Sequence, residues 1–126
     1  MLLQDFFKII NADIADNEAL VEVELNPQHA IFQGHFPGHP ITPGVCVTQM
    51  AVDLFSHIQR QEYALTKAKS VKFIHIIKPE ENLRVHYQLN WEQVAEQQYQ
   101  IKALVYHEDT TFAKINILLT PNLLTF

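Results

Sequence analysis

The chain has 126 residues, 48% of them hydrophobic, which is enough for one domain with a core and too few for two domains of ordinary size. Its 14 acidic and 9 basic residues give a formal net charge of -5, which disfavours nucleic-acid binding because that requires an excess of Lys and Arg on one face. The single cysteine, Cys46, allows no disulfide within the chain, and no apolar run is long enough to span a bilayer. We therefore expect one cytoplasmic domain over residues 1–126, without a membrane partner.

The first ten residues, MLLQDFFKII, combine apolar side chains with Asp5 and Lys8 and have no cationic lead-in. This pattern predicts a short amphipathic helix rather than a signal peptide. Residues 20–25 then alternate apolar and acidic side chains, which is the period of a strand with one buried face. A loop rich in Gly and Pro follows over residues 33–43.

One long helix is expected over residues 44–60. Its apolar side chains recur at spacings of three and four residues, on one face: Val47, Met50, Ala51, Leu54, Phe55 and Ile58. After a strand around residues 67–74, alternation predicts further strands over residues 83–91, 99–105 and 113–119. The fold class is therefore α+β, with an antiparallel sheet packed on one face against a single central helix. Because one helix cannot cover both faces of such a sheet, we expect at least a dimer.

The loop before the long helix has the composition of a functional site. Pro37 and Gly38 suit the two central positions of a type II turn, because Pro fixes the first φ and Gly accepts the positive second one. His35 would then be held on a stiff loop. Thr42 is a suitable N-cap and Pro43 a suitable first helical residue.

Gly44 falls in the first turn of the helix, where backbone N–H groups have no intrahelical acceptor. It has no side chain to block a ligand, and its amide lies at the positive end of the helix. Such an amide can hold a carbonyl oxygen and stabilise the enolate that forms when the adjacent carbon loses a proton. A neutral imidazole nearby, that of His35, can accept this proton.

The motif in this loop is Gly34-His35-Phe36-Pro37-Gly38-x-Pro40-x-x-Pro43-Gly44, preceded by Phe32-Gln33. It resembles the signature of the 3-hydroxyacyl-ACP dehydratases of fatty-acid synthesis, and the likeness extends weakly through the helix to Pro79. The resemblance implies a hot-dog fold, with the sheet wrapped around one central helix. It also implies a homodimer or a trimer of dimers with the site at the dimer interface.

The implied reaction is loss of water from a 3-hydroxyacyl thioester on acyl carrier protein, giving the trans-2-enoyl thioester without cofactor or metal. By the same resemblance, His35 is the general base next to the thioester and Gly44 supplies the oxyanion contact. The neighbouring motif residues are implied to bind the substrate: Phe36, Pro37, Gly38 and Pro43.

One position departs from the family pattern. The family has Glu or Asp five residues after the last glycine of the motif, where it assists loss of the hydroxyl as water. Here that position is Gln49, which cannot donate a proton as a carboxylic acid does. Asp53 stands four residues further on, where the family often has Gln, so the acid and the amide are exchanged by one helical turn. We take both residues as site candidates.

The remaining reactive side chains are interpreted as structural. Nothing in the sequence assembles the scattered histidines: His29, His57, His75, His86 and His107. Cys46 fits a small buried hydrophobe better than a nucleophile. His35 and His39 have the spacing of a helical metal pair, but Pro and Gly intervene and no carboxylate or Cys accompanies them, so we expect no metal site.

Basic residues are concentrated in one part of the chain: Arg60, Lys67, Lys69, Lys72, Lys78 and Arg84. They are either solvated strand residues or a positive patch that guides an acidic acyl carrier protein.

Three functions remain open at this point: a dehydratase, an acyl-binding subunit that has lost the acid and pairs with an active paralogue, and, less strongly, a thioesterase. A thioesterase needs a placed carboxylate to activate water, so Gln49 weakens it equally. The acyl length depends on the packing of Phe55, Phe73 and Ile76, which the sequence does not place.

Overall fold

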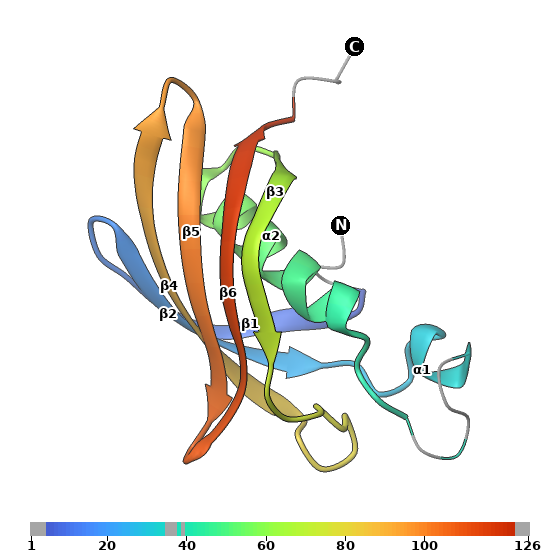
Figure 1. Cartoon of the computed structure of the whole chain (residues 1–126). Helices are drawn as coiled ribbons and strands as arrows, with labels where there is room; N and C mark the ends of the chain where they lie inside the picture. Colours follow the sequence, from blue (N-terminus) through green and yellow to red (C-terminus); the bar gives the residue numbers. More distant parts are fainter. Residues whose placement is uncertain (1–4, 35–37, 39, 123–126) are drawn as a thin grey trace.

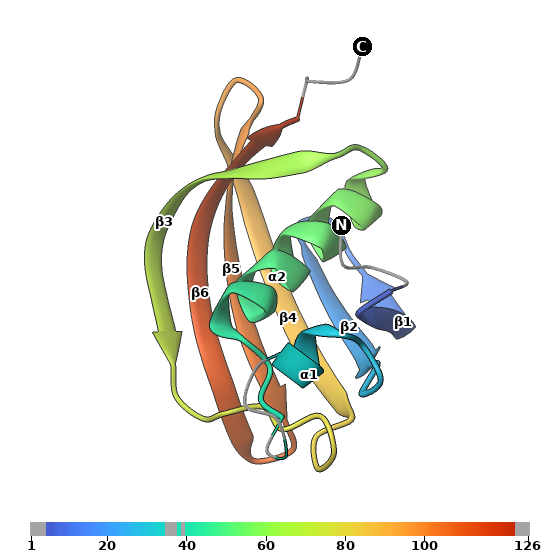
Figure 2. The ribbon, with the colours of Figure 1, turned by 90° about the vertical axis from the view of Figure 1, so that its right-hand side faces the viewer.

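The computed structural model describes residues 5–34, 38 and 40–122. The elements in chain order are β1 (Phe7–Ile14), β2 (Glu18–Leu25), α1 (Ile31–Gly34), α2 (Gly44–Gln59), β3 (Tyr63–Phe73), β4 (Arg84–Ala95), β5 (Gln98–His107) and β6 (Thr110–Pro121). The six strands form one antiparallel sheet in the order β1-β2-β4-β5-β6-β3. The sheet curves around α2, which lies along its concave side (Figure 1, Figure 2). This arrangement is the hot-dog fold, and the predicted α+β class is confirmed.

The core lies between the concave face of the sheet and α2. Alternate residues of β4, β5 and β6 are buried in it: Val85, Tyr87, Leu89, Trp91, Ile101, Ala103, Val105, Ala113, Ile115, Ile117 and Leu119. The helix adds five of the residues predicted from its spacing: Val47, Met50, Ala51, Leu54 and Phe55. Ile58, the sixth, is partly buried against the same cluster. The predicted helix and the strands of the second half are confirmed.

The start of the chain differs from the prediction. Phe7 begins β1, which pairs antiparallel with β2, so that Phe7 lies opposite Leu25 and Ile9 opposite Val23. The predicted amphipathic helix is therefore wrong for the described residues of this segment. A helix of about ten residues is marginal in water, whereas the strand gains a ladder of hydrogen bonds on the edge of β2 and buries Phe7.

The loop expected over residues 33–43 contains the end of a one-turn helix, α1, whose Phe32 is buried and stacks on Phe6 with ring centroids 5.2 Å apart. Gly38 has a φ of +88°, as the second central position of a type II turn requires. The loop thus has a helical turn at its first end and the predicted glycine conformation in its middle.

Candidate active site

The N-terminus of α2 differs from the sequence prediction by one residue. Pro43 is the N-cap, with φ -61° and ψ 142°, and no side chain caps the helix. The predicted N-cap, Thr42, is instead tied to the segment after β3, because its N–H donates to the carbonyl of Ile77 at 2.9 Å. The first hydrogen bonds of α2 run from the N–H groups of Cys46 and Val47 to the carbonyl of Pro43, at 2.9 and 3.1 Å.

The amides of Gly44 and Val45 precede these bonds and have no acceptor within the described part of the chain. Two backbone donors are therefore available at the positive end of a 16-residue helix. This is the arrangement that the sequence predicted for Gly44.

The first turns of α2 are fixed to the sheet by Tyr87 of β4. Its hydroxyl donates to the carbonyl of Val47 at 2.7 Å and also lies 3.6 Å from the sulfur of Met50. Burial raises the pKa of the Tyr87 phenol well above its usual value, and the thiol of Cys46 adds to this effect. The phenol therefore stays protonated and keeps donating, which holds the helix start in a constant position against the sheet.

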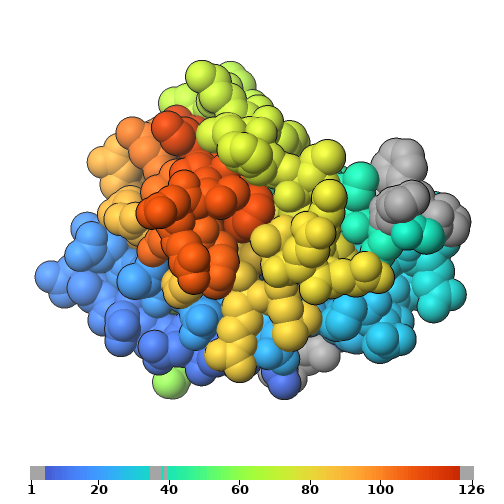
Figure 3. Space-filling model, turned by 90° about the horizontal axis from the view of Figure 1, so that it is seen from below, coloured from blue at the N-terminus to red at the C-terminus, as the bar shows by residue number. Residues whose placement is uncertain are grey.

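A cavity of about 290 Å³ lies between the start of α2 and the segment that follows β3. Figure 3 views the end of the molecule where these two segments lie beside each other. Most of the lining is apolar: Ile41, Pro43, Gly44, Val47, Phe73, Ile74, Ile76, Ile77, Phe112 and Ala113. Thr42 and His75 contribute the polar side chains. Gly44 thus presents its backbone to a mainly apolar space, which is the usual character of a small-molecule site.

Gly44 lies in close contact with Phe73. A Cβ at this position would lie 2.8 Å from the ring of Phe73, closer than real Cβ contacts come. The Phe73 side chain, at the end of β3, is still 54% exposed although it covers Gly44 and lines the cavity. Phe73 therefore limits the space beside the Gly44 amide.

The polar side chains of the cavity are arranged as follows. The ring Nδ1 of His75 lies 3.0 Å from the carbonyl oxygen of Thr111. Because a carbonyl only accepts, Nδ1 carries the proton, and Nε2 of the neutral ring has the lone pair. The hydroxyl of Thr42 is buried and has no hydrogen-bond partner within the described chain. A buried hydroxyl without a partner costs about 1–3 kcal/mol.

The two exchanged helix residues lie together, outside this cavity. Gln49 donates from Nε2 to Oδ1 of Asp53 at 2.9 Å, and Asp53 is 1% exposed. Neither residue is among those that line the cavity beside Gly44. The spacing of one helical turn thus predicted that they share a face, and the structure adds that they bind each other.

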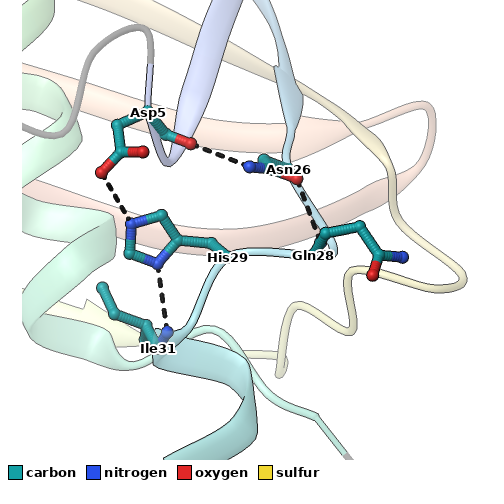
Figure 4. A network of polar contacts seen from close by, with 5 residues as sticks. All are labelled: Asp5, Asn26, Gln28, His29 and Ile31. Atoms are coloured by element: carbon teal, nitrogen blue, oxygen red, sulfur yellow. Dashed lines mark hydrogen bonds and ion pairs between the residues drawn. The ribbon is translucent and has the colours of Figure 1, made fainter.

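Three of the predicted site residues, His35, Phe36 and Pro37, lie outside the described residues. The chain enters this stretch from α1, which is anchored by the polar network of Figure 4. Nε2 of His29 lies 3.0 Å from a carboxylate oxygen of Asp5, and its Nδ1 accepts the N–H of Ile31 at 3.1 Å.

Asn26 extends this network. Its side chain donates to the carbonyl of Asp5 and accepts the N–H of Gln28, both at 3.0 Å. The segment before the motif is therefore held by several hydrogen bonds.

A family model described as ApeI-like, ApeI dehydratase, matches residues 11–115. The chain belongs to the ApeI-like dehydratase family. The dehydratase heterocomplex ApeI:P from Xenorhabdus doucetiae has a similar fold, with a TM-score of 0.71 and 22% identity over 89% of this chain and 96% of that chain.

Two curated relatives are 3-hydroxyacyl-[acyl-carrier-protein] dehydratases FabZ. One from Thermus thermophilus is 45% identical over 42 residues, a match that spans only 33% of this chain and 28% of the relative. The one from Bordetella petrii is 28% identical over 117 residues, 82% of this chain and 78% of the relative. The dehydratase resemblance of the loop motif is confirmed at the level of the family.

Several residues of this cavity were not identified from the sequence. His75 was interpreted as structural, and Phe112 was not singled out, although both line the cavity. Of the three residues named for acyl length, Phe73 and Ile76 line it, whereas Phe55 packs in the core against Tyr63 and Trp91. Only the placement of the segment after β3 against the start of α2 brings these residues to the site, and no local pattern encodes that contact.

Cys46 is buried, as expected, and burial raises the pKa of its thiol. A raised pKa keeps the thiol protonated and poorly nucleophilic. Within the described residues no helix is long and apolar enough to cross a membrane, and no three His, Cys, Asp or Glu side chains gather as metal ligands.

Proposed function

We propose that this protein eliminates water from a 3-hydroxyacyl thioester carried on an acyl carrier protein, giving the trans-2-enoyl thioester. The observation that carries the proposal is the apolar cavity that meets the free amide of Gly44 at the N-terminus of α2. The thioester carbonyl accepts a hydrogen bond from this amide, and His35 removes the proton from C2. The acyl group lies against the apolar wall of the cavity, and the motif residues Phe36, Pro37, Gly38 and Pro43 bind the thioester end.

The energetic basis is the charge that develops on the carbonyl oxygen as C2 loses its proton. A preorganised backbone donor at such an oxygen is worth about 10²–10³ in rate. The helix dipole has the favourable sign, and the apolar wall strengthens the interaction by lowering the local dielectric. Gly44 has no Cβ, so no side chain of its own stands beside this amide, where an added Cβ would meet the Phe73 ring.

The second candidate is an acyl-binding subunit that works beside an active paralogue. Gln49 and Asp53 favour it, because they are bound to each other and lie outside the cavity, so neither offers a proton donor there. The similarity to a dehydratase heterocomplex adds to this view.

The sheet supports an assembly of at least two chains. β3 lies at one edge of the sheet, where its outer backbone groups have no neighbouring strand among residues 5–34, 38 and 40–122. Large apolar side chains are exposed near that edge: Val45 at 76% and Phe73 at 54%. Pairing of two β3 edges would give a homodimer, or a trimer of dimers, in which a second chain lies beside each cavity. The β3 edge could equally pair with the corresponding edge strand of a paralogue.

The carrier protein is proposed to dock on a lysine patch formed by Lys72, Lys102 and Lys114. Lys72 of β3 lies directly opposite Lys114 of β6, and Lys102 of β5 lies opposite Asn116. Like charges directly opposite in a sheet are unfavourable, and none of the three forms an ion pair within the described chain. An acidic protein surface would relieve this repulsion.

The patch differs from the basic cluster expected from the sequence. Lys102 and Lys114 join it from outside that cluster, while Arg84 pairs with Glu24 and is not part of it. In sequence, Lys72 is next to Phe73 and Lys114 is next to Ala113, and both neighbours line the cavity.

The deciding experiment incubates the purified chain alone with a 3-hydroxyacyl-pantetheine thioester and follows the enoyl product by absorbance. We expect measurable turnover, and we expect both Gln49→Glu and Asp53→Asn to change it by less than about threefold, since neither residue lines the cavity. A wild-type rate equal to that of buffer, unchanged by Gln49→Glu, would leave the acyl-binding subunit as the better account.

A further inference from the structure

We propose that His75 donates the proton that converts the departing 3-hydroxyl group to water. The inference rests on the proposed dehydratase function and assigns the acid that Gln49 does not provide. His75 lines the same cavity as Gly44 and comes from a different segment, the one after β3.

The backbone around His75 is fixed to β6. The N–H groups of Ile74 and His75 both donate to the carbonyl of Phe112, at 2.7 and 3.2 Å. The ring is fixed as well, because its Nδ1 donates to the carbonyl of Thr111 at 3.0 Å. With one nitrogen used for anchoring, Nε2 is the ring atom that can exchange a proton with a ligand.

This anchor permits both protonation states of the ring. The Thr111 carbonyl accepts from Nδ1–H whether the ring is neutral or charged, so Nε2 can gain and lose a proton while the ring stays in place. His29 provides the contrast: its Nδ1 accepts the N–H of Ile31, so a second ring proton would break that bond. Of the described residues that line the cavity, His75 is the one whose side chain carries an acid–base group; the others are apolar residues, Gly44 and Thr42.

The proposed elimination moves one proton to His35 and one proton from His75. The general base, His35, takes the C2 proton, the electron pair of that C–H bond forms the C2=C3 double bond, and the C3–O bond breaks. Nε2–H of the charged His75 ring gives its proton to the departing oxygen, so that the leaving group is water. One imidazole has then gained a proton and the other has lost one, and exchange with solvent restores both.

The test separates removal of the C2 proton from loss of the hydroxyl. Exchange of the C2 hydrogens of a saturated acyl-pantetheine thioester with deuterium requires the base and the Gly44 amide, but no acid. Elimination from the 3-hydroxyacyl thioester requires all three. We compare wild type with His75→Asn, whose amide can still donate to the Thr111 carbonyl but which has no proton to give to the hydroxyl.

We expect His75→Asn to lower elimination by about 10²–10⁴-fold and to leave C2 exchange within about threefold of wild type. The matched control is His107→Gln, a histidine outside the cavity, which should leave both rates unchanged.

Two results would overturn the assignment. Elimination within threefold of wild type in His75→Asn would show that another group provides the proton. Equal loss of exchange and elimination, in a variant that unfolds at the wild-type temperature, would place His75 at the C2 step instead. A wild-type chain that neither exchanges nor eliminates would instead reject the proposed function, which is a different outcome from either of these.

Discussion

The two ends of the motif loop are built differently. At the first end, His29 uses both ring nitrogens, one toward Asp5 and one toward the N–H of Ile31 (Figure 4). At the second end, the amide of Gly44 and the hydroxyl of Thr42 have no partner within the described residues, and they border a cavity. One end satisfies its polar groups, and the other leaves them available.

This difference separates stability from function. Hydrogen bonds that are complete within the chain stabilise it, whereas a buried polar group without a partner destabilises it by about 1–3 kcal/mol. A buried polar group of this kind beside a cavity is expected where a bound ligand supplies the missing hydrogen bond. We therefore expect substitutions at the first end to change the free energy of unfolding, and substitutions at the second end to change substrate turnover.

The largest effect is expected for His35→Ala, in the loop between the two ends. Loss of the general base should lower kcat by about 10²–10⁴-fold. The unfolding temperature should stay close to that of wild type, because a loop residue contributes little to core packing. Turnover and thermal unfolding measured on one preparation test both parts, and near-normal turnover in the folded variant would remove His35 from the mechanism.

The next largest effect is expected at one of the two glycines that flank the loop. Gly44→Ala should lower kcat/KM by about 10–100-fold, because its Cβ would meet the Phe73 ring at 2.8 Å and displace it into the cavity. Gly34→Ala is the matched control, since a Cβ there meets nothing within 4 Å. Steady-state kinetics that measure kcat/KM of both variants test this prediction. Equal losses would mean that chain stiffness, and not the space beside Phe73, explains the effect of Gly44→Ala.

At the first end, His29→Ala should lower the free energy of unfolding by about 1–2 kcal/mol, because it removes the acceptor of the Ile31 N–H and the bond to Asp5. Asp5→Asn should have a smaller effect, since an amide oxygen still accepts from His29. Urea unfolding measures both. A His29→Ala protein with unchanged stability but lower turnover would reverse the distinction between the two ends.

The smallest effect is expected on the sheet, away from both ends. Replacing Lys72 and Lys114 together by Gln should weaken binding of an acidic acyl carrier protein about three- to tenfold at low salt, and little at high salt, because salt screens long-range attraction. Lys8→Gln is the control, because Lys8 already pairs with Glu24 at the other edge of the sheet. Binding that does not change between low and high salt would argue against this docking surface.

The sequence alone determined the elements whose period is local. Alternation over β4, β5 and β6, and the three- and four-residue spacing in α2, predicted which side chains are buried, because each period fixes one face of its element. It also determined the positive φ of Gly38 and the free amide of Gly44, since the properties of Pro and Gly act within a few residues.

Only the tertiary structure decided the features that depend on distant segments. β1 forms because the edge of β2 is available to it, so the pairing of Ile9 with Val23 outweighed a local helical pattern. Pro43 replaced Thr42 as the N-cap because the N–H of Thr42 bonds to Ile77, 35 positions further along the chain. The same contact between the start of α2 and the segment after β3 brings Phe73 and His75 to the cavity that Gly44 lines. Such contacts depend on strand register and on the path of the chain after β3, which no local period of the sequence specifies.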